Sequence, residues 1–280
     1  MNTREIISID TSLGSVAVEV TGHGTPIVFW HSLFVDRRSW DAQRDFLANT
    51  YRVVLIDGPG HGESSHPDRK YTLEDCAEAA LTVLDRLDIP SAPFVGCAWG
   101  GHVGVTLAAR HPERISCLVV LGSPMQPLVG LERVRAAVLT VAFRFVGATP
   151  FLVEQAVRAL VAEHAPREAR AYVEGCLKSA DRRGLVLAMR SIMLGRPSLV
   201  GLLPTIRQAG IPCLFATGDQ DLLWPPALAA EHAKLAGAEL RTFTGVAHLP
   251  SVEAPNEVNA LLSEWLQQER GAARRDQFVG

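Results

Sequence analysis

The sequence predicts an α/β fold in which a mostly parallel sheet is covered by helices on both faces. Short apolar runs typical of buried strands alternate with longer segments whose apolar residues recur at helical spacing. Residues 131–206 break this alternation, because they contain helical patterns and no convincing strand. The alternation then resumes, so this stretch is predicted to be a helical cap inserted over the edge of the sheet where ligands bind in open α/β sheets.

The strands are expected as short apolar runs bounded by turn residues. An opening hairpin is predicted around Gly14, from residues 6–9 and 15–20. Further strands are predicted at 26–30, 53–56, 93–97, 115–121, 211–216 and 239–243. Together these runs supply the sheet.

The helices are expected where apolar residues recur every three to four positions. Residues 73–87 show this spacing with acidic residues at the start, which is typical of an amphipathic helix N-terminus. The remaining helices are predicted at 100–109, 134–146, 152–164, 167–179 and 254–268, with prolines separating those in the middle of the chain. The predicted organisation is a core of residues 1–123 and 207–270, a cap of residues 124–206 and a flexible tail of residues 271–280.

Composition bounds the possible functions. The 280 residues suffice for one elaborated domain, and 27 basic against 30 acidic residues, without a basic block, argue against nucleic acid as a partner. No apolar run approaches the roughly 18 residues of a membrane span, and residues 1–5 lack the pattern of a secretory signal. The five scattered cysteines lack paired metal-ligand spacing. We expect a cytoplasmic protein with reduced thiols, no metal and no cofactor; a homodimer is left open.

Residues 96–100, Gly-Cys-Ala-Trp-Gly, carry the most specific motif. In the pattern Gly-x-Ser-x-Gly, a strand turns sharply into a helix, and the central side chain is thrust into the active site. An apolar run precedes this pentapeptide and a helical pattern follows it. The context therefore fits a nucleophile elbow, but Ala98 stands where the nucleophile belongs.

Four further segments fit the same fold. Two of them follow the elbow in the chain order that this fold requires, which is nucleophile, acid, histidine. Asp221 lies three residues past the glycine of a strand-to-turn segment, 214–221, and His248 lies between the last predicted strand and the last helix. Residues 29–33 are Phe-Trp-His-Ser-Leu, and residues 56–64 contain Asp-Gly-Pro-Gly-His-Gly-Glu-Ser. With these motifs the chain resembles the α/β-hydrolase family, especially its esterase and enol-lactonase branch, over roughly residues 5–270.

The resemblance implies an eight-stranded α/β-hydrolase fold and a role for each motif residue. Ala98 would occupy the nucleophile position, Asp221 would orient the imidazole, and His248 would be the general base that activates a serine hydroxyl. The backbone amides of Leu33 and Trp99 would stabilise the oxyanion.

Other interpretations remain for several of these residues. Asp219 competes with Asp221 as the acid, although the family's spacing favours Asp221. His31 and Ser32 either touch the ligand or support the loop that does. Trp224 is a candidate pocket residue or a core residue. Cys97 lies one position off the apex and is interpreted as a packing thiol.

Three functions are consistent with this pattern. The first is a serine hydrolase of small or medium esters or lactones in which alanine replaces serine, so that substrate binds and is barely hydrolysed. The second is a cofactor-free lyase or oxygenase that uses the His248–Asp221 pair as a bare general base. The third is a ligand-binding pseudoenzyme. Thioester and carbon–carbon bond hydrolysis fit the same motifs, whereas a haloalkane dehalogenase would need an aspartate at the elbow.

Overall fold

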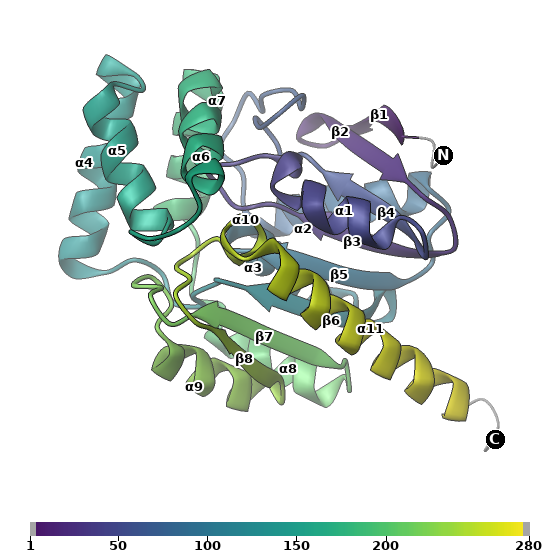
Figure 1. Cartoon of the computed structure of the whole chain (residues 1–280). Coiled ribbons are helices and arrows are strands. Elements are labelled where there is room, and N and C mark those ends of the chain that lie inside the picture. The colour runs from purple at the N-terminus through teal and green to yellow at the C-terminus, as the bar shows by residue number, and fades with distance from the viewer. Residues whose placement is uncertain (1–3, 277–280) are drawn as a thin grey trace.

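The computed structural model describes residues 4–276 and the side chains as far as residue 269 (Figure 1). Its eight strands form one sheet in the order β1-β2-β4-β3-β5-β6-β7-β8. β1 pairs antiparallel with β2 and β2 antiparallel with β4, whereas the other neighbours are parallel. The strands are β1 (Arg4–Thr11), β2 (Gly14–Thr21), β3 (Thr25–Trp30), β4 (Tyr51–Ile56), β5 (Ala92–Cys97), β6 (Ile115–Leu121), β7 (Cys213–Gly218) and β8 (Glu239–Phe243). The predicted hairpin and mostly parallel sheet are confirmed.

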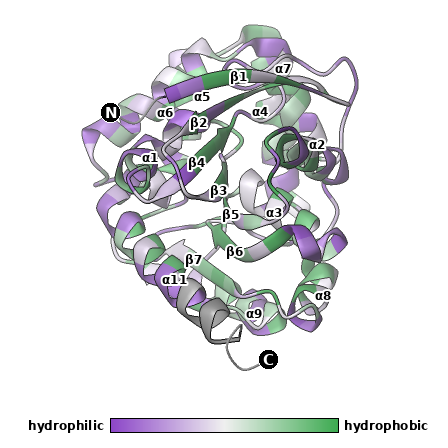
Figure 2. Cartoon of the chain, turned by 90° about the vertical axis from the view of Figure 1, so that its right-hand side faces the viewer, coloured by the Kyte–Doolittle hydropathy of each residue, from purple (hydrophilic) through white to green (hydrophobic). Residues whose placement is uncertain are grey.

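Helices cover both faces of the sheet (Figure 2). One face carries α1 (Asp41–Leu47) and α11 (Pro255–Asp276), and the other carries α2 (Leu73–Arg86), α3 (Trp99–Arg110) and α8 (Leu203–Gln208). α9 (Pro226–Ala236) packs against β7 and α8. Because both faces are covered, the central strands are mostly apolar, and Val28, Val54 and Val119 are at most 1% exposed.

The segment between β6 and β7 is helical, as predicted. It contains α4 (Gly130–Val146), α5 (Pro150–Leu160), α6 (Arg167–Ser179) and α7 (Arg182–Ala188), followed by a π-helical turn over Met189–Met193. Figure 1 shows α4 to α7 gathered at one end of the sheet, apart from the helices that cover its faces. We call residues 124–206 the helical insertion; its assignment as a separate cap unit remains a prediction.

Several element boundaries differ from the sequence-based expectation, most clearly the ends of α5 and α11. α5 ends at Leu160 instead of continuing to residue 164, because Val161 is extended and the amide of Ala162 donates to the Glu253 carboxylate. α11 continues to Asp276, past the predicted start of a tail at residue 271, since extending an existing helix needs no new nucleus. The rest of the predicted tail, 277–280, lies outside the described residues.

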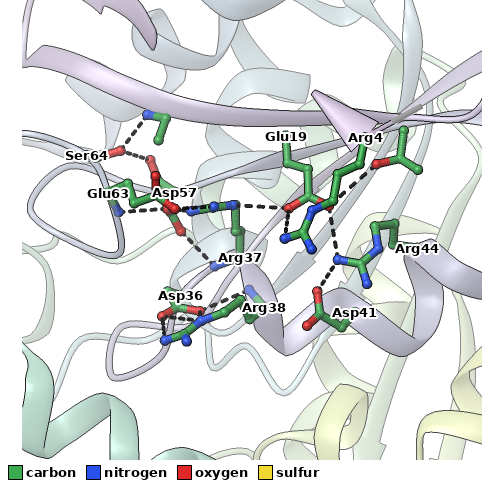
Figure 3. Close-up of polar contacts among 12 residues, drawn as sticks. Arg4, Glu19, Asp36, Arg37, Arg38, Asp41, Arg44, Asp57, Glu63 and Ser64 are labelled. Atoms are coloured by element: carbon green, nitrogen blue, oxygen red, sulfur yellow. Dashed lines mark hydrogen bonds and ion pairs between the residues drawn. The ribbon is translucent and has the colours of Figure 1, made fainter. Parts of the chain in front are cut away.

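A buried network of charged side chains joins β2, β4 and the segment before α1 (Figure 3). Arg37, with a side chain 4% exposed, donates to both Glu19 and Asp57, whose side chains are fully buried. Glu19 also accepts from Arg44 at 3.0 Å and from Arg4 at 2.7 Å. Each buried carboxylate is therefore compensated by a guanidinium, which is the condition under which charges persist in a core.

Two further sequence-based expectations concern the membrane and the cysteines. None of the helices within residues 4–276 has both the length and the apolar character needed to cross a membrane. All five cysteines are buried free thiols. They act as small apolar packing groups.

Candidate active site

The junction of β5 and α3 has the geometry of a nucleophile elbow. Ala98, between the two elements, has a φ of 49°, a left-handed conformation that costs an alanine free energy. Two hydrogen bonds hold it there: its amide donates to the Leu121 carbonyl at 2.8 Å, and its carbonyl accepts from the His102 amide at 3.0 Å. The structure thus supports a strained apex whose side chain is only a methyl group.

The glycines on either side of Ala98 are required by close backbone contacts. A Cβ atom at Gly96 would lie 2.1 Å from the carbonyl carbon of Gly100. One at Gly100 would lie 2.0 Å from the carbonyl oxygen of Trp30. No side chain fits at such distances. This turn therefore requires glycine two positions before the apex and two positions after it.

His248 and Asp221 form a buried pair. The Nδ1 of His248 lies 2.9 Å from the Oδ2 of Asp221. The other oxygen, Oδ1, accepts from the amides of Leu223 at 2.8 Å and Trp224 at 3.0 Å. Burial raises the pKa of Asp221, but the His248 ring and these amides outweigh burial and leave the pKa below its ordinary value. The ionised Asp221 accepts a hydrogen bond from the Nδ1–H group, which fixes the tautomer in which Nε2 is the basic nitrogen of the ring.

Two backbone amides are free beside the apex. Within residues 4–276, the amides of Leu33 and Trp99 have no hydrogen-bond acceptor. His61 holds the Leu33 peptide, since its Nε2 contacts the Leu33 carbonyl. Trp99 is the first residue of α3, where amides have no partner inside the helix. The arrangement offers two donors to a developing negative charge.

A cavity of about 310 Å³ connects these groups. Ala98, Trp99, Leu33, Ser32 and His248 all line it. The rest of its wall comes mostly from apolar side chains of the helical insertion and its flanks, among them Leu128, Val129, Leu160, Ile192 and Met193. The cavity therefore combines polar groups near Ala98 with mostly apolar side chains from the helical insertion, as small-molecule sites commonly do.

Two of the predicted pocket residues do not line this cavity. His31 is fully buried beneath the loop, where its Nδ1 donates to the Ser32 carbonyl at 2.7 Å and its Nε2 accepts from the Gly58 amide at 2.8 Å. Burial lowers the pKa of His31 to about 4, so the ring is neutral and shapes the loop. Trp224 is also fully buried, and its Nε1 donates to His232 at 2.9 Å. Its neighbour Leu223 reaches the cavity instead.

The remaining sequence alternatives have structural roles. Asp219 accepts from the Gly245 amide at 2.8 Å and closes a turn, whereas Asp221 is the carboxylate paired with His248. The Cys97 thiol, 1% exposed, lies 3.7 Å from the backbone carbonyl oxygen of His248. Burial raises the pKa of this thiol, which suits packing and opposes thiolate chemistry.

Four polar residues at the cavity were not found from the sequence. His102 lies one helical turn after Ala98, and Gln126, Glu132 and Arg196 come from the helical insertion. A lone histidine in a helix and a lone arginine after a π-helical turn carry no motif. Only the folded chain brings them to one wall.

Glu253, also not identified from the sequence, holds the loop that carries His248. Its carboxylate accepts from the amides on both sides of the histidine, Ala247 at 3.1 Å and Leu249 at 2.9 Å, and from Ala162 of the helical insertion at 2.8 Å. The side chain is buried, with the residue 6% exposed. Glu253 therefore positions His248 without touching the cavity.

Replacing Glu253 with glutamine is expected to lower the free energy of unfolding by about 1–3 kcal/mol. A carboxamide keeps one acceptor oxygen and turns an N–H group toward buried amides that need acceptors. Urea denaturation measures the loss. Glu257→Gln is the matched control, because Glu257 is exposed on α11 and its loss should stay within about 0.5 kcal/mol. Equal stability of the two variants would contradict this role of Glu253.

Comparisons with known proteins agree with the fold. The family model for the alpha/beta hydrolase fold matches residues 25–159. A dihydrolipoyllysine-residue acetyltransferase component of an acetoin cleaving system from Pseudomonas putida is 29% identical over 250 residues, covering 88% of this chain and 64% of that protein. The chain spans 20 to 64% of the length of the first curated relatives that it matches.

Solved structures extend the similarity over nearly the whole chain. A malate-bound thermophilic esterase from Thermogutta terrifontis superposes with a TM-score of 0.86 at 25% identity, covering 95% of this chain and 99% of the esterase. An enol-lactonase from Burkholderia xenovorans LB400 gives 0.83 at 24% identity, covering 93% and 100%. The similarity at these identities concerns the fold and leaves the substrate open.

Proposed function

Since the chain has the fold of the α/β-hydrolase family, we propose that it is a serine-hydrolase framework in which Ala98 fills the nucleophile position. It binds small or medium carboxylic esters or lactones and scarcely hydrolyses them. Without the hydroxyl there is no acyl-enzyme intermediate. The site then keeps its ability to bind substrate, an oriented base and two hydrogen-bond donors for the oxyanion.

One observation carries the proposal: the His248–Asp221 pair faces the same cavity as a strained elbow. A left-handed alanine costs free energy and gains nothing from its methyl group. The buried Asp221 carboxylate accepts hydrogen bonds from the Leu223 and Trp224 amides, the Thr217 hydroxyl and the His248 ring, an arrangement suited to orienting a base. These features support an arrangement built around a hydroxyl at position 98.

The cavity and the relatives support the acyl substrate class. The wall is mainly apolar, and the free amides of Leu33 and Trp99 suit the oxygen of a polarised carbonyl. Curated relatives include a 3-oxoadipate enol-lactonase from Acinetobacter baylyi and a 2-hydroxymuconate semialdehyde hydrolase from Pseudomonas, each matched over about a third of this chain or somewhat more. An ester or lactone carbonyl is the group that such a site polarises.

A crystal structure of the chain soaked with esters and lactones tests the proposal. The expected result is an intact ligand whose carbonyl carbon lies over Ala98 and whose carbonyl oxygen accepts from the Leu33 and Trp99 amides. A ligand bound with its carbonyl turned away from both amides would contradict it. Because the nucleophile is absent, no bond breaks during the soak.

A second function, general-base catalysis without a serine, is favoured by the free Nε2 of His248. No residue in the described part of the chain bonds this nitrogen. An oriented imidazole can remove a proton from a bound carbon acid directly. Turnover of such a compound by the unaltered chain, lost in His248→Gln, would favour this function over the hydrolase framework. Ligand binding near His248 without turnover would exclude it.

A further inference from the structure

Arg196 is a buried cation without a partner. It follows the π-helical turn Met189–Met193, is 8% exposed, and lines the cavity. Its Nη1 has no hydrogen-bond partner, and none of its side-chain nitrogens forms a hydrogen bond or ion pair with the described residues. Burial lowers the pKa of Arg196 to about 10, so the guanidinium remains charged at neutral pH.

No carboxylate among the side chains described, residues 4–269, forms an ion pair with Arg196. Glu132 also lines the cavity, but it is exposed and lies outside ion-pair distance of Arg196. Burial and the Arg196 charge hold the pKa of His102 well below its ordinary value, so the ring is neutral and supplies no charge; its Nε2 donates to the Pro124 carbonyl at 2.8 Å. Arg37 and Arg44, in contrast, are each paired with buried carboxylates. Arg196 is thus unlike the other buried arginines.

An uncompensated buried charge is costly to the folded state. The cost is offset when a ligand supplies the counter-charge in the same low-dielectric space. A guanidinium presents parallel N–H groups that match the two oxygens of a carboxylate. Among the described residues that line the cavity, Arg196 is the one arginine or lysine, and a single guanidinium suits a single carboxylate better than a phosphate, which would call for more cations.

We propose that Arg196 is the specificity residue of this cavity and that the preferred acyl ligand carries a free carboxylate, bound by the guanidinium while its ester or lactone carbonyl lies at Ala98. This inference rests on the proposed function for the reacting end of the ligand. It adds the chemical group at the other end of the ligand, a carboxylate. Neutral esters of the same length would leave the buried cation unpaired and bind more weakly.

Calorimetric titration of the unaltered chain tests the inference with matched probes. Monomethyl succinate, adipate and suberate each carry one ester and one carboxylate, and their dimethyl esters are the neutral counterparts. At least one monoester is expected to bind tenfold or more tightly than its diester. Arg196→Gln should remove this preference and weaken that monoester by at least roughly 30-fold. Inorganic phosphate should not displace it.

Arg190→Gln is the matched control. Arg190 lies on the π-helical turn that precedes Arg196, but its side chain is exposed and lines a separate hollow. The substitution removes the same charge and should leave monoester binding unchanged. If Arg196→Gln does not fold, Arg196→Lys decides: it keeps the charge, loses the two-pronged contact, and should weaken the monoester while Arg190→Gln does not.

The outcomes separate this inference from the proposed function. If every diester binds as well as its monoester, or phosphate displaces the monoester with equal affinity, the carboxylate site is wrong, even if Ala98→Ser hydrolyses the diesters. If a monoester binds in an Arg196-dependent way and Ala98→Ser hydrolyses no ester, lactone or thioester, the carboxylate site holds and the hydrolase framework fails.

Discussion

Replacing Ala98 with serine is expected to raise kcat for ester or lactone hydrolysis by about 10⁴- to 10⁶-fold, roughly 5–8 kcal/mol of transition-state stabilisation. The backbone already holds the left-handed conformation at position 98, so a serine adds only a hydroxyl to an existing elbow. His248, oriented by Asp221, is the base for that hydroxyl. Steady-state hydrolysis of a panel of acyl esters, lactones and thioesters measures the gain.

Two controls make the result specific. Cys97→Ser places a hydroxyl one residue before the apex, where the present side chain points into the core, and should give no activity. Ala98→Ser combined with His248→Ala should lose nearly all of the gain, because the hydroxyl then has no base. A broad panel with no hydrolysis by Ala98→Ser would count against the hydrolase framework. Equal activity of Cys97→Ser would show that the gain does not depend on the elbow.

Replacing Arg37 with methionine is expected to lower the free energy of unfolding by about 3–5 kcal/mol. Arg37 donates to Asp57 and Glu19, two carboxylates whose side chains are fully buried, and methionine fills space without charge. The loss therefore comes mainly from two buried anions with fewer partners. Urea denaturation followed by circular dichroism measures it.

The adjacent residue provides the control for Arg37. Arg38 is half exposed, at 52%, and pairs with Asp36 alone. Arg38→Met should cost less than Arg37→Met, about 1–2 kcal/mol, because only one buried carboxylate, Asp36, loses a guanidinium, and the Tyr172 hydroxyl still donates to it. If Arg37→Met is as stable as Arg38→Met, Asp57 and Glu19 do not depend on a guanidinium, and the network shown in Figure 3 is not a stability determinant.

The fold was predictable because it follows from patterns along the chain. Strands buried on both faces read as apolar runs, and α2 reads as an amphipathic helix with a capping box of Thr72 and Asp75. The elbow was predictable for a similar reason, since Gly96 and Gly100 are fixed by contacts within a few residues and with β3. A steric requirement set mainly by residues close in sequence can be recognised from the sequence.

The cavity wall was not predictable in the same way. Arg196, in the helical insertion, meets Ala98 and His248 at the cavity only in the folded chain, and Glu253 acts on His248 through backbone amides that any residue could supply. His31 and Trp224 lie beside motif residues in sequence but project into the core. The assignment of Asp221 and His248 to catalysis stays a prediction, although the structure brings the two side chains together.

Two hydrogen bonds join the end of α5 to the loop that carries His248 and to Glu253. The His248 amide donates to the Leu160 carbonyl at 3.2 Å, and Glu253 bonds the Ala162 amide just beyond α5. These two bonds anchor the backbone of the His248 loop to the end of α5, whereas Asp221 orients the ring itself. The loop that carries the base is therefore fixed to the helical insertion as well as to the sheet.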